Sequence, residues 1–119
     1  MQGLKIQLDE SRQDIVLVEL EGYLDAHTFE KLETLETLFE ELFERDKHRL
    51  MVDLNKLRYI SSAGAGVFIG ALGVCQENEG NIALIRPSPE VKEIFDLLGV
   101  FHIFPIASSP EEALLVLNN

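Results

Sequence analysis

The chain has 119 residues, of which 46% are hydrophobic, and its formal net charge is −11. It is long enough to bury one core and too hydrophobic for disorder, so we expect a single domain over residues 1–119. The acidic charge argues against a basic surface that binds nucleic acid or an anionic membrane. The N-terminus does not resemble a signal peptide, no apolar stretch is long enough to cross a bilayer, and the lone Cys75 lies in an apolar run, so we expect a reducing, cytoplasmic location.

The N-terminal third of the chain predicts a hairpin followed by a helix. Apolar and polar residues alternate over residues 4–8, which is the period of a half-buried strand, and a more buried strand is expected at residues 15–20 after a polar turn. Residues 22–25 end that second strand, and Asp25 is a candidate cap for the helix that follows. Helical spacing relates the apolar residues of this helix, which are Phe29, Leu32, Leu35, Phe39, Leu42 and Phe43.

The central segment predicts a strand, a loop and a helix. Residues 50–54 form a short apolar run that is typical of a buried strand, and a polar interval separates them from Ser61 and Ser62 at the entrance to a helix. The apolar run that follows the serines is too rich in glycine for a strand. Its glycines line one side of the predicted helix, where we expect a neighbouring backbone to approach closely, and they are Gly66, Gly70 and Gly73.

The C-terminal third continues the alternation of strands and helices. We expect a strand at residues 82–85, a helix that is capped by Ser88 and ended by Gly99, and a short edge strand at residues 103–106. A capping box at residues 109–112 begins a last helix. Strands that alternate with helices after a first hairpin predict an α/β fold, in which helices cover a mixed sheet.

The two serines of the central segment suggest several kinds of chemistry, most of which fail on the sequence. The glycines after them match neither a dinucleotide-binding fingerprint nor a phosphate-binding loop, and Ile60 replaces the first glycine of a hydrolase elbow. Two interpretations of Ser62 survive: a helix cap, or a serine that carries a phosphate at the positive end of the helix. The residue pattern alone leaves both open. Lys56 and Arg58 precede the serines and are either solvated or placed to attract a phosphate.

The histidines do not form a catalytic or metal-binding pattern. His27, His48 and His102 are scattered without the spacing of metal ligands, and the sequence supports no serine–histidine–aspartate arrangement. We therefore expect no metal, no other cofactor and no enzymatic activity.

Three blocks of the sequence resemble the STAS domain of bacterial anti-sigma factor antagonists. Residues 60–67, Ile-Ser-Ser-Ala-Gly-Ala-Gly-Val, are similar to the signature of that family. Residues 21–25 resemble its turn before the first helix, and residues 88–99 resemble its late helix. The resemblance covers essentially the whole chain. It implies the STAS fold, a mixed sheet of about five strands with about four helices packed on it.

The resemblance also implies roles for individual residues. In this family the serine before the Ala-Gly pair is phosphorylated by a cognate anti-sigma kinase, and that serine corresponds to Ser62. The family often has an aspartate just before this serine, and here the position is Ser61, which makes Ser61 the second candidate for phosphorylation. The residues implied to contact the partner are Asp25, Ser61, Ser62, Ala63 and Gly64.

The function that the resemblance implies is that of an anti-sigma factor antagonist in a partner-switching circuit. The unphosphorylated chain would bind an anti-sigma factor that is also a serine kinase, phosphorylation of Ser62 would release it, and a phosphatase would reset the chain. ATP and Mg²⁺ would belong to the kinase. A STAS subunit of a stressosome-type scaffold or of a lipid-transport complex is the alternative with the same fold. A nucleotide hydrolase is a third class, for which we expect no turnover.

Overall fold

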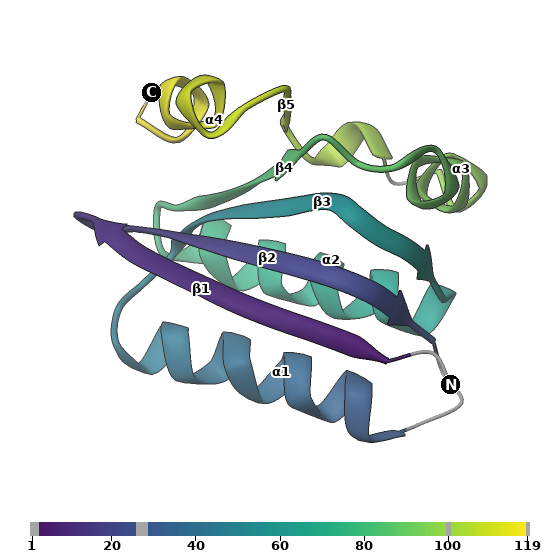
Figure 1. Ribbon diagram of the computed structural model, residues 1–119. Coiled ribbons are helices and arrows are strands. Elements are labelled where there is room, and N and C mark those ends of the chain that lie inside the picture. Colours follow the sequence, from purple (N-terminus) through teal and green to yellow (C-terminus); the bar gives the residue numbers. More distant parts are fainter. Residues whose placement is uncertain (1–2, 26–28, 100, 119) are drawn as a thin grey trace.

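The computed structural model describes residues 3–25, 29–99 and 101–118, which form a five-stranded sheet with four α-helices (Figure 1). The strands are β1 (Leu4–Arg12), β2 (Ile15–Leu24), β3 (Arg49–Ile60), β4 (Asn81–Ile85) and β5 (Ile106–Ala107). The helices are α1 (Phe29–Glu44), α2 (Ser62–Glu77), α3 (Pro89–Leu97) and α4 (Pro110–Leu117), and a 3₁₀ turn covers Phe101–Ile103. The expected α/β fold with a mixed sheet is confirmed.

The strands lie in the sheet in the same order as along the chain. β1 and β2 pair antiparallel, whereas β2, β3, β4 and β5 are parallel neighbours. Helices α1, α2 and α3 bury their apolar residues on one side of the sheet, and α4 packs on the other side. Because β2 and β3 are parallel, their carboxyl ends reach the same edge of the sheet.

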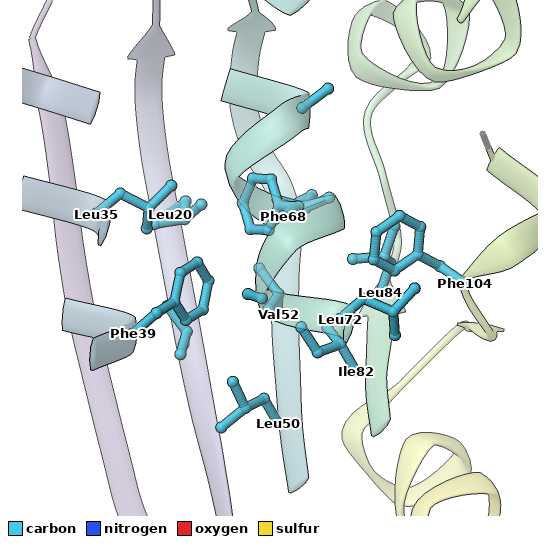
Figure 2. Packing of buried hydrophobic residues seen from close by; sticks show 14 of the residues in the cluster. Leu20, Leu35, Phe39, Leu50, Val52, Phe68, Leu72, Ile82, Leu84 and Phe104 are labelled. Carbon is cyan, nitrogen blue, oxygen red and sulfur yellow. The ribbon is translucent and has the colours of Figure 1, made fainter. Parts of the chain in front are cut away.

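The larger core lies between the sheet and the helices α1, α2 and α3, and α3 contributes Val91 and Phe95 to it (Figure 2). Phe68 of α2 is fully buried, and its ring meets that of Phe39 of α1 edge-on, with centroids 5.8 Å apart and an interplanar angle of 73°. Aromatic pairs favour this geometry because the positive edge of one ring meets the negative face of the other. A smaller core beneath α4 consists of Ile15, Leu17, Met51, Ala83, Ile85, Ala107, Ala113 and Leu117.

Strand β3 is longer than the sequence predicts. A strand at residues 50–54 followed by a loop was expected, whereas β3 continues to Ile60, and β2 likewise extends beyond its predicted end. The register between the two strands shifts twice within residues 19–23 of β2. In this half of β3 the buried residues Leu57 and Ile60 are three positions apart instead of two. Irregular pairing of this kind disrupts the two-residue alternation by which a strand is identified in a sequence.

The C-terminal third follows the prediction except at the edge strand. Ser88 and Ser109 cap α3 and α4 as expected, since their Oγ atoms accept the N–H groups of Val91 and Glu112 at 3.4 Å and 3.1 Å. The expected short edge strand is present, but its predicted bounds, residues 103–106, are wrong, because a 3₁₀ turn ends at Ile103 and β5 covers only Ile106–Ala107. A two-residue strand carries too little pattern to be located from sequence.

The glycines of α2 do not have the role that their spacing suggested. A Cβ atom added at Gly66, Gly70 or Gly73 would meet nothing within 4 Å, so no neighbouring backbone packs on that side of the helix. The expected close approach is therefore wrong. Gly64, two residues before Gly66, is the tightly packed glycine, because a Cβ atom there would lie 3.0 Å from side-chain carbons of Leu24 and Ile60.

Cys75 is buried in α2, and burial raises the pKa of its thiol to about 12. Only the thiolate reacts readily with disulfide reagents. We therefore expect that Ellman's reagent at pH 8 labels the thiol only after urea has unfolded the chain. The absorbance of the released thiolate measures this, and labelling of the folded protein at the rate of a free thiol would contradict the burial.

Candidate functional site

The predicted site residues gather where β2 and β3 end side by side. Leu24 is paired with Ile60, so Asp25 and Ser61 are the next residues on two adjacent parallel strands. The backbone N–H of Ser61 donates to the carbonyl oxygen of Leu24 at 2.9 Å. This bond fixes the entrance of α2 against the end of β2, and it brings together two segments that are far apart in the sequence.

Ser61 is the cap of α2. Its backbone is extended (φ −83°, ψ 166°), and its Oγ accepts the N–H of Gly64 at 3.0 Å. Its carbonyl oxygen accepts the N–H of Ala65 at 2.9 Å, and the residue is only 9% exposed. The capping role considered for Ser62 therefore belongs to Ser61, whose hydroxyl is engaged inside the fold.

Ser62 is the first residue of α2, and it is exposed. The amides of the first helical turn have no intrahelical acceptor, and one of them, that of Gly64, is already satisfied by Ser61. The first turn of α2 contains no acidic residue. The Ser62 hydroxyl thus combines access from solvent with the positive end of a helix dipole, which favours negative charge.

Ala63 and Gly64 complete the entrance of the helix. Ala63 is exposed beside Ser62, whereas Gly64 is buried beneath it and lies against Leu24 and Ile60. The same segment therefore presents Ser62 and Ala63 outward and uses Ser61 and Gly64 to hold them in place.

Asp25 lies at the neighbouring strand end and forms an ion pair. Its Oδ2 is 3.4 Å from Nζ of Lys31 in α1, and the side chains of Asp25 and Lys31 are only 14% and 15% exposed. Lys31 was not singled out from the sequence, because a single lysine among glutamates on a helix gives no signal of its partner. Residues 26–28, which include His27 and lie between Asp25 and α1, are outside the described residues, so the capping role of Asp25 stays a prediction.

A groove between α1 and α2 begins at the site. Gly66 and Gly70 of α2 form part of its lining, and it runs from Ala63 along the helix. From α1 it is lined by Glu36, Phe39, Glu40 and Phe43. The groove could not be predicted from the sequence, because helical spacing shows which residues share a face but not which faces of two helices meet.

The two cations that precede the serines are weakly paired. Nζ of Lys56 is 3.9 Å from Glu21, and Nη1 of Arg58 is 3.9 Å from Glu90, with all four side chains at least half exposed. Exposed pairs of this length contribute at most about 1 kcal/mol. Both side chains on β3 are therefore solvated, in agreement with one of the two roles considered for them.

The described ranges contain neither a metal-binding cluster nor a membrane-spanning helix. No group of three histidine, cysteine, aspartate or glutamate side chains is arranged to hold a metal ion. No helix in these ranges combines the length and the apolar character needed to cross a membrane. His48, a candidate considered above, instead stacks on Phe43 with 5.3 Å between ring centroids.

Replacing the cap separates the roles of the two serines. Ser61→Ala removes the acceptor for the Gly64 N–H, and we expect the free energy of unfolding to fall by about 1 kcal/mol. Ser62→Ala serves as the matched control, because no comparable contact is lost at an exposed first-turn position. Urea unfolding followed by circular dichroism measures both changes, and equal stability of the two variants would contradict the assignment of the cap.

The chain is similar in sequence to known proteins over most of its length. The model of the STAS domain family matches residues 7–113. An anti-sigma F factor antagonist of Paenibacillus polymyxa is 28% identical over 112 residues, which are 94% of this chain and 93% of that protein. BtrV of Bordetella bronchiseptica is 35% identical over 81 residues, which are 68% of this chain and 70% of BtrV.

Solved structures show the same fold. The anti-sigma factor antagonist SpoIIAA in its unphosphorylated form superposes with a TM-score of 0.76 at 24% identity, over 92% of this chain and 93% of SpoIIAA. Its phosphorylated form superposes with a TM-score of 0.72 at 22% identity, over 94% and 98% of the two chains. The family model covers most of the chain, and the five-stranded mixed sheet with four helices is the architecture of these neighbours. This chain therefore belongs to the STAS domain family.

Proposed function

We propose that this chain is an anti-sigma factor antagonist whose binding is switched by phosphorylation of Ser62. The observation that carries the proposal is the contrast between the two serines: Ser62 is exposed at the first position of α2, and Ser61 is a buried cap. Relatives that align over most of the chain are named anti-sigma factor antagonists, which supports the role.

The unphosphorylated chain binds its anti-sigma factor through the exposed residues at the entrance of α2 and the neighbouring strand end. The surface offered to the partner includes Ser62 and Ala63, with Asp25 beside them, while Ser61 and Gly64 support it from below. Binding occupies the anti-sigma factor, so the sigma factor is released.

Phosphorylation reverses this binding through charge. A phosphoserine carries about −1.5 to −2 charges, and an interface that has no partner for them is destabilised by desolvation and repulsion. The first-turn amides and the positive end of the helix dipole stabilise the phosphate on this chain. The chain therefore stays folded while the complex dissociates. The anti-sigma factor supplies the kinase activity, with ATP and Mg²⁺, and a separate serine phosphatase resets the switch. The chain itself is a protein substrate and not an enzyme.

A reconstituted competition assay tests this function. A fluorescent sigma factor is bound to an anti-sigma factor kinase of the same organism, and the unphosphorylated chain is added while anisotropy is followed. We expect the chain to displace the sigma factor, and prior incubation of the chain with the kinase, ATP and Mg²⁺ to prevent displacement. Peptide mapping by mass spectrometry locates the phosphate. Binding to the kinase without displacement, or no transfer of phosphate, would favour the scaffold role instead.

A further inference from the structure

The outer edge of β1 is open. β1 stands at the end of the strand order, and no other strand of the described ranges lies on its outer side. Its pairing with β2 is regular from Leu4 opposite Gly22 to Asp9 opposite Leu17, before the register shifts. Regular edges of this length are usually blocked in soluble proteins, since they offer unpaired backbone groups to another strand.

The direction of these backbone groups follows from the ladder on the inner side. The N–H of Tyr23 donates to the carbonyl oxygen of Gly3 at 2.9 Å, and this pair continues the register of Leu4 with Gly22. Hydrogen-bonded and non-hydrogen-bonded pairs alternate along an antiparallel ladder. The outward-facing N–H and C=O groups of β1 are therefore those of Leu4, Ile6 and Leu8.

The same three residues turn their side chains towards α1. Leu4 and Ile6 pack against the larger core, and Leu8 is 40% exposed in a shallow groove that it shares with Ile6, Thr34 and Leu38. An apolar side chain added beside Leu8 from outside the sheet would cover this exposed surface.

We propose that β1 pairs antiparallel with β1 of a second copy of this chain, about a two-fold axis that passes through Gln7. In this register Ile6 of each copy faces Leu8 of the other at the centre of the α1 side of the sheet, and Leu4 faces Glu10 at the ends. On the opposite side Lys5 faces Asp9, and Gln7 faces Gln7. Opposite charges and apolar residues directly across two strands stabilise a pairing. The outward backbone groups of Ile6 and Leu8 then bond across the axis.

Neighbouring registers lack this complementarity. Residues that lie directly opposite each other must point to the same face of the sheet. The two-fold axis can therefore shift along β1 only to positions at which odd-numbered residues remain opposite odd-numbered residues. An axis at Ile6 would set Lys5 opposite Gln7 and leave its charge unpaired. An axis at Leu8 would set Ile6 opposite Glu10. The axis at Gln7 sets Leu4 opposite Glu10 only at the ends of the pairing, and of these three axes it alone joins apolar pairs at the centre to a pair of opposite charges.

The net charge and the small contact area both limit the affinity of the pairing. Two chains of charge −11 repel each other, but most of that repulsion is screened over about 8 Å at 0.15 M salt. A pairing of one short strand with another buries less than the roughly 1,200 Å² of a standard interface, so the dimer is weak. At low ionic strength the chain is accordingly monomeric.

Disulfide trapping tests the register. In Gln7→Cys the two thiols lie in a non-hydrogen-bonded pair with Cα atoms about 4.5 Å apart, within the range of a disulfide. We expect rapid dimeric disulfide formation with diamide at 0.15 M salt. Lys5→Cys is the matched control, because its own copy lies four residues farther along the strand, and it should couple only when mixed with Asp9→Cys. The buried Cys75 does not compete. Coupling of Gln7→Cys no faster than Lys5→Cys alone would overturn the proposal.

Sedimentation equilibrium tests the association of the unmodified chain. We expect a reversible monomer–dimer equilibrium in which the dimer becomes populated as the concentration is raised towards about 1 mM, because an interface below the standard size is weak. Leu8→Pro removes an outward N–H and leaves the inner ladder intact, so it should fold and remain monomeric over this range. Its fold is checked by circular dichroism. A wild-type chain that stays monomeric at 1 mM, or a folded Leu8→Pro that dimerises equally well, would overturn the proposal.

Discussion

Ser62→Ala is expected to abolish phosphorylation by the anti-sigma factor kinase while the chain still folds and still binds. The hydroxyl of Ser62 is exposed at the first position of α2, whereas that of Ser61 accepts the Gly64 N–H at 3.0 Å and is buried. A kinase can reach the hydroxyl of Ser62 without disturbing the fold, but it must break the helix cap to reach the hydroxyl of Ser61. Transfer of ³²P from ATP and intact-mass analysis measure the loss.

Two further variants make this result specific. Ser62→Asp places a permanent charge at the same position, and we expect it to weaken anti-sigma factor binding by at least about tenfold, because burying an unpaired charge costs more than the 1.4 kcal/mol that tenfold represents. Ser61→Ala should remain a substrate despite its lower stability. Phosphate mapped to Ser61 in the Ser62→Ala protein would show that the site was assigned to the wrong serine.

Gly64→Val is expected to lower the free energy of unfolding by about 2 to 3 kcal/mol. A Cβ atom at this position would lie 3.0 Å from Cδ2 and Cγ of Leu24 and from Cγ1 of Ile60. These atoms belong to the ends of β2 and β3, so the helix entrance must move outward or the strand ends must yield. The loss is measured as a shift of the urea midpoint at an unchanged slope.

Gly66→Val is the matched control for this substitution. It adds the same side chain to the same helix, but its Cβ atom would meet nothing within 4 Å, and valine is a better helix former than glycine by about 0.5 kcal/mol. We expect its stability to be unchanged or slightly raised. Equal destabilisation by the two substitutions would mean that α2 tolerates no valine anywhere, and not that Gly64 is packed against the strand ends.

The fold and the place of the site were largely predictable because their signals are local. Alternation over residues 4–8, helical spacing in α1, and the caps Ser88 and Ser109 each depend on residues within one or two turns, and the structure confirms them. The position of the two serines at the entrance of α2 was likewise predictable from local sequence. Their position relative to Asp25 was suggested only by resemblance, since nothing in the spacing of the two segments predicts that they are neighbours.

Other features depend on contacts between distant segments. The length of β3 follows from register shifts against β2, and the partner of Asp25 is a lysine of α1. The glycines of α2 were expected to face a neighbouring backbone, yet they line an open groove, and only Gly64 is closely packed. A helical stripe has the same pattern whether it faces solvent or protein, so the sequence could not distinguish the two.

The sequence by itself determined an acidic α/β domain of the STAS type with two serines at the start of a glycine-rich helix, because composition, periodicity and motif are properties of the chain alone. Only the tertiary structure decided which of the two serines is the buried helix cap and which is exposed. Hydrogen bonds from Ser61 to Leu24 and from Gly64 to Ser61 bury the first hydroxyl and leave Ser62 exposed. Adjacent residues at a helix entrance point in different directions, and the strand end against which the entrance packs selects the one that faces solvent.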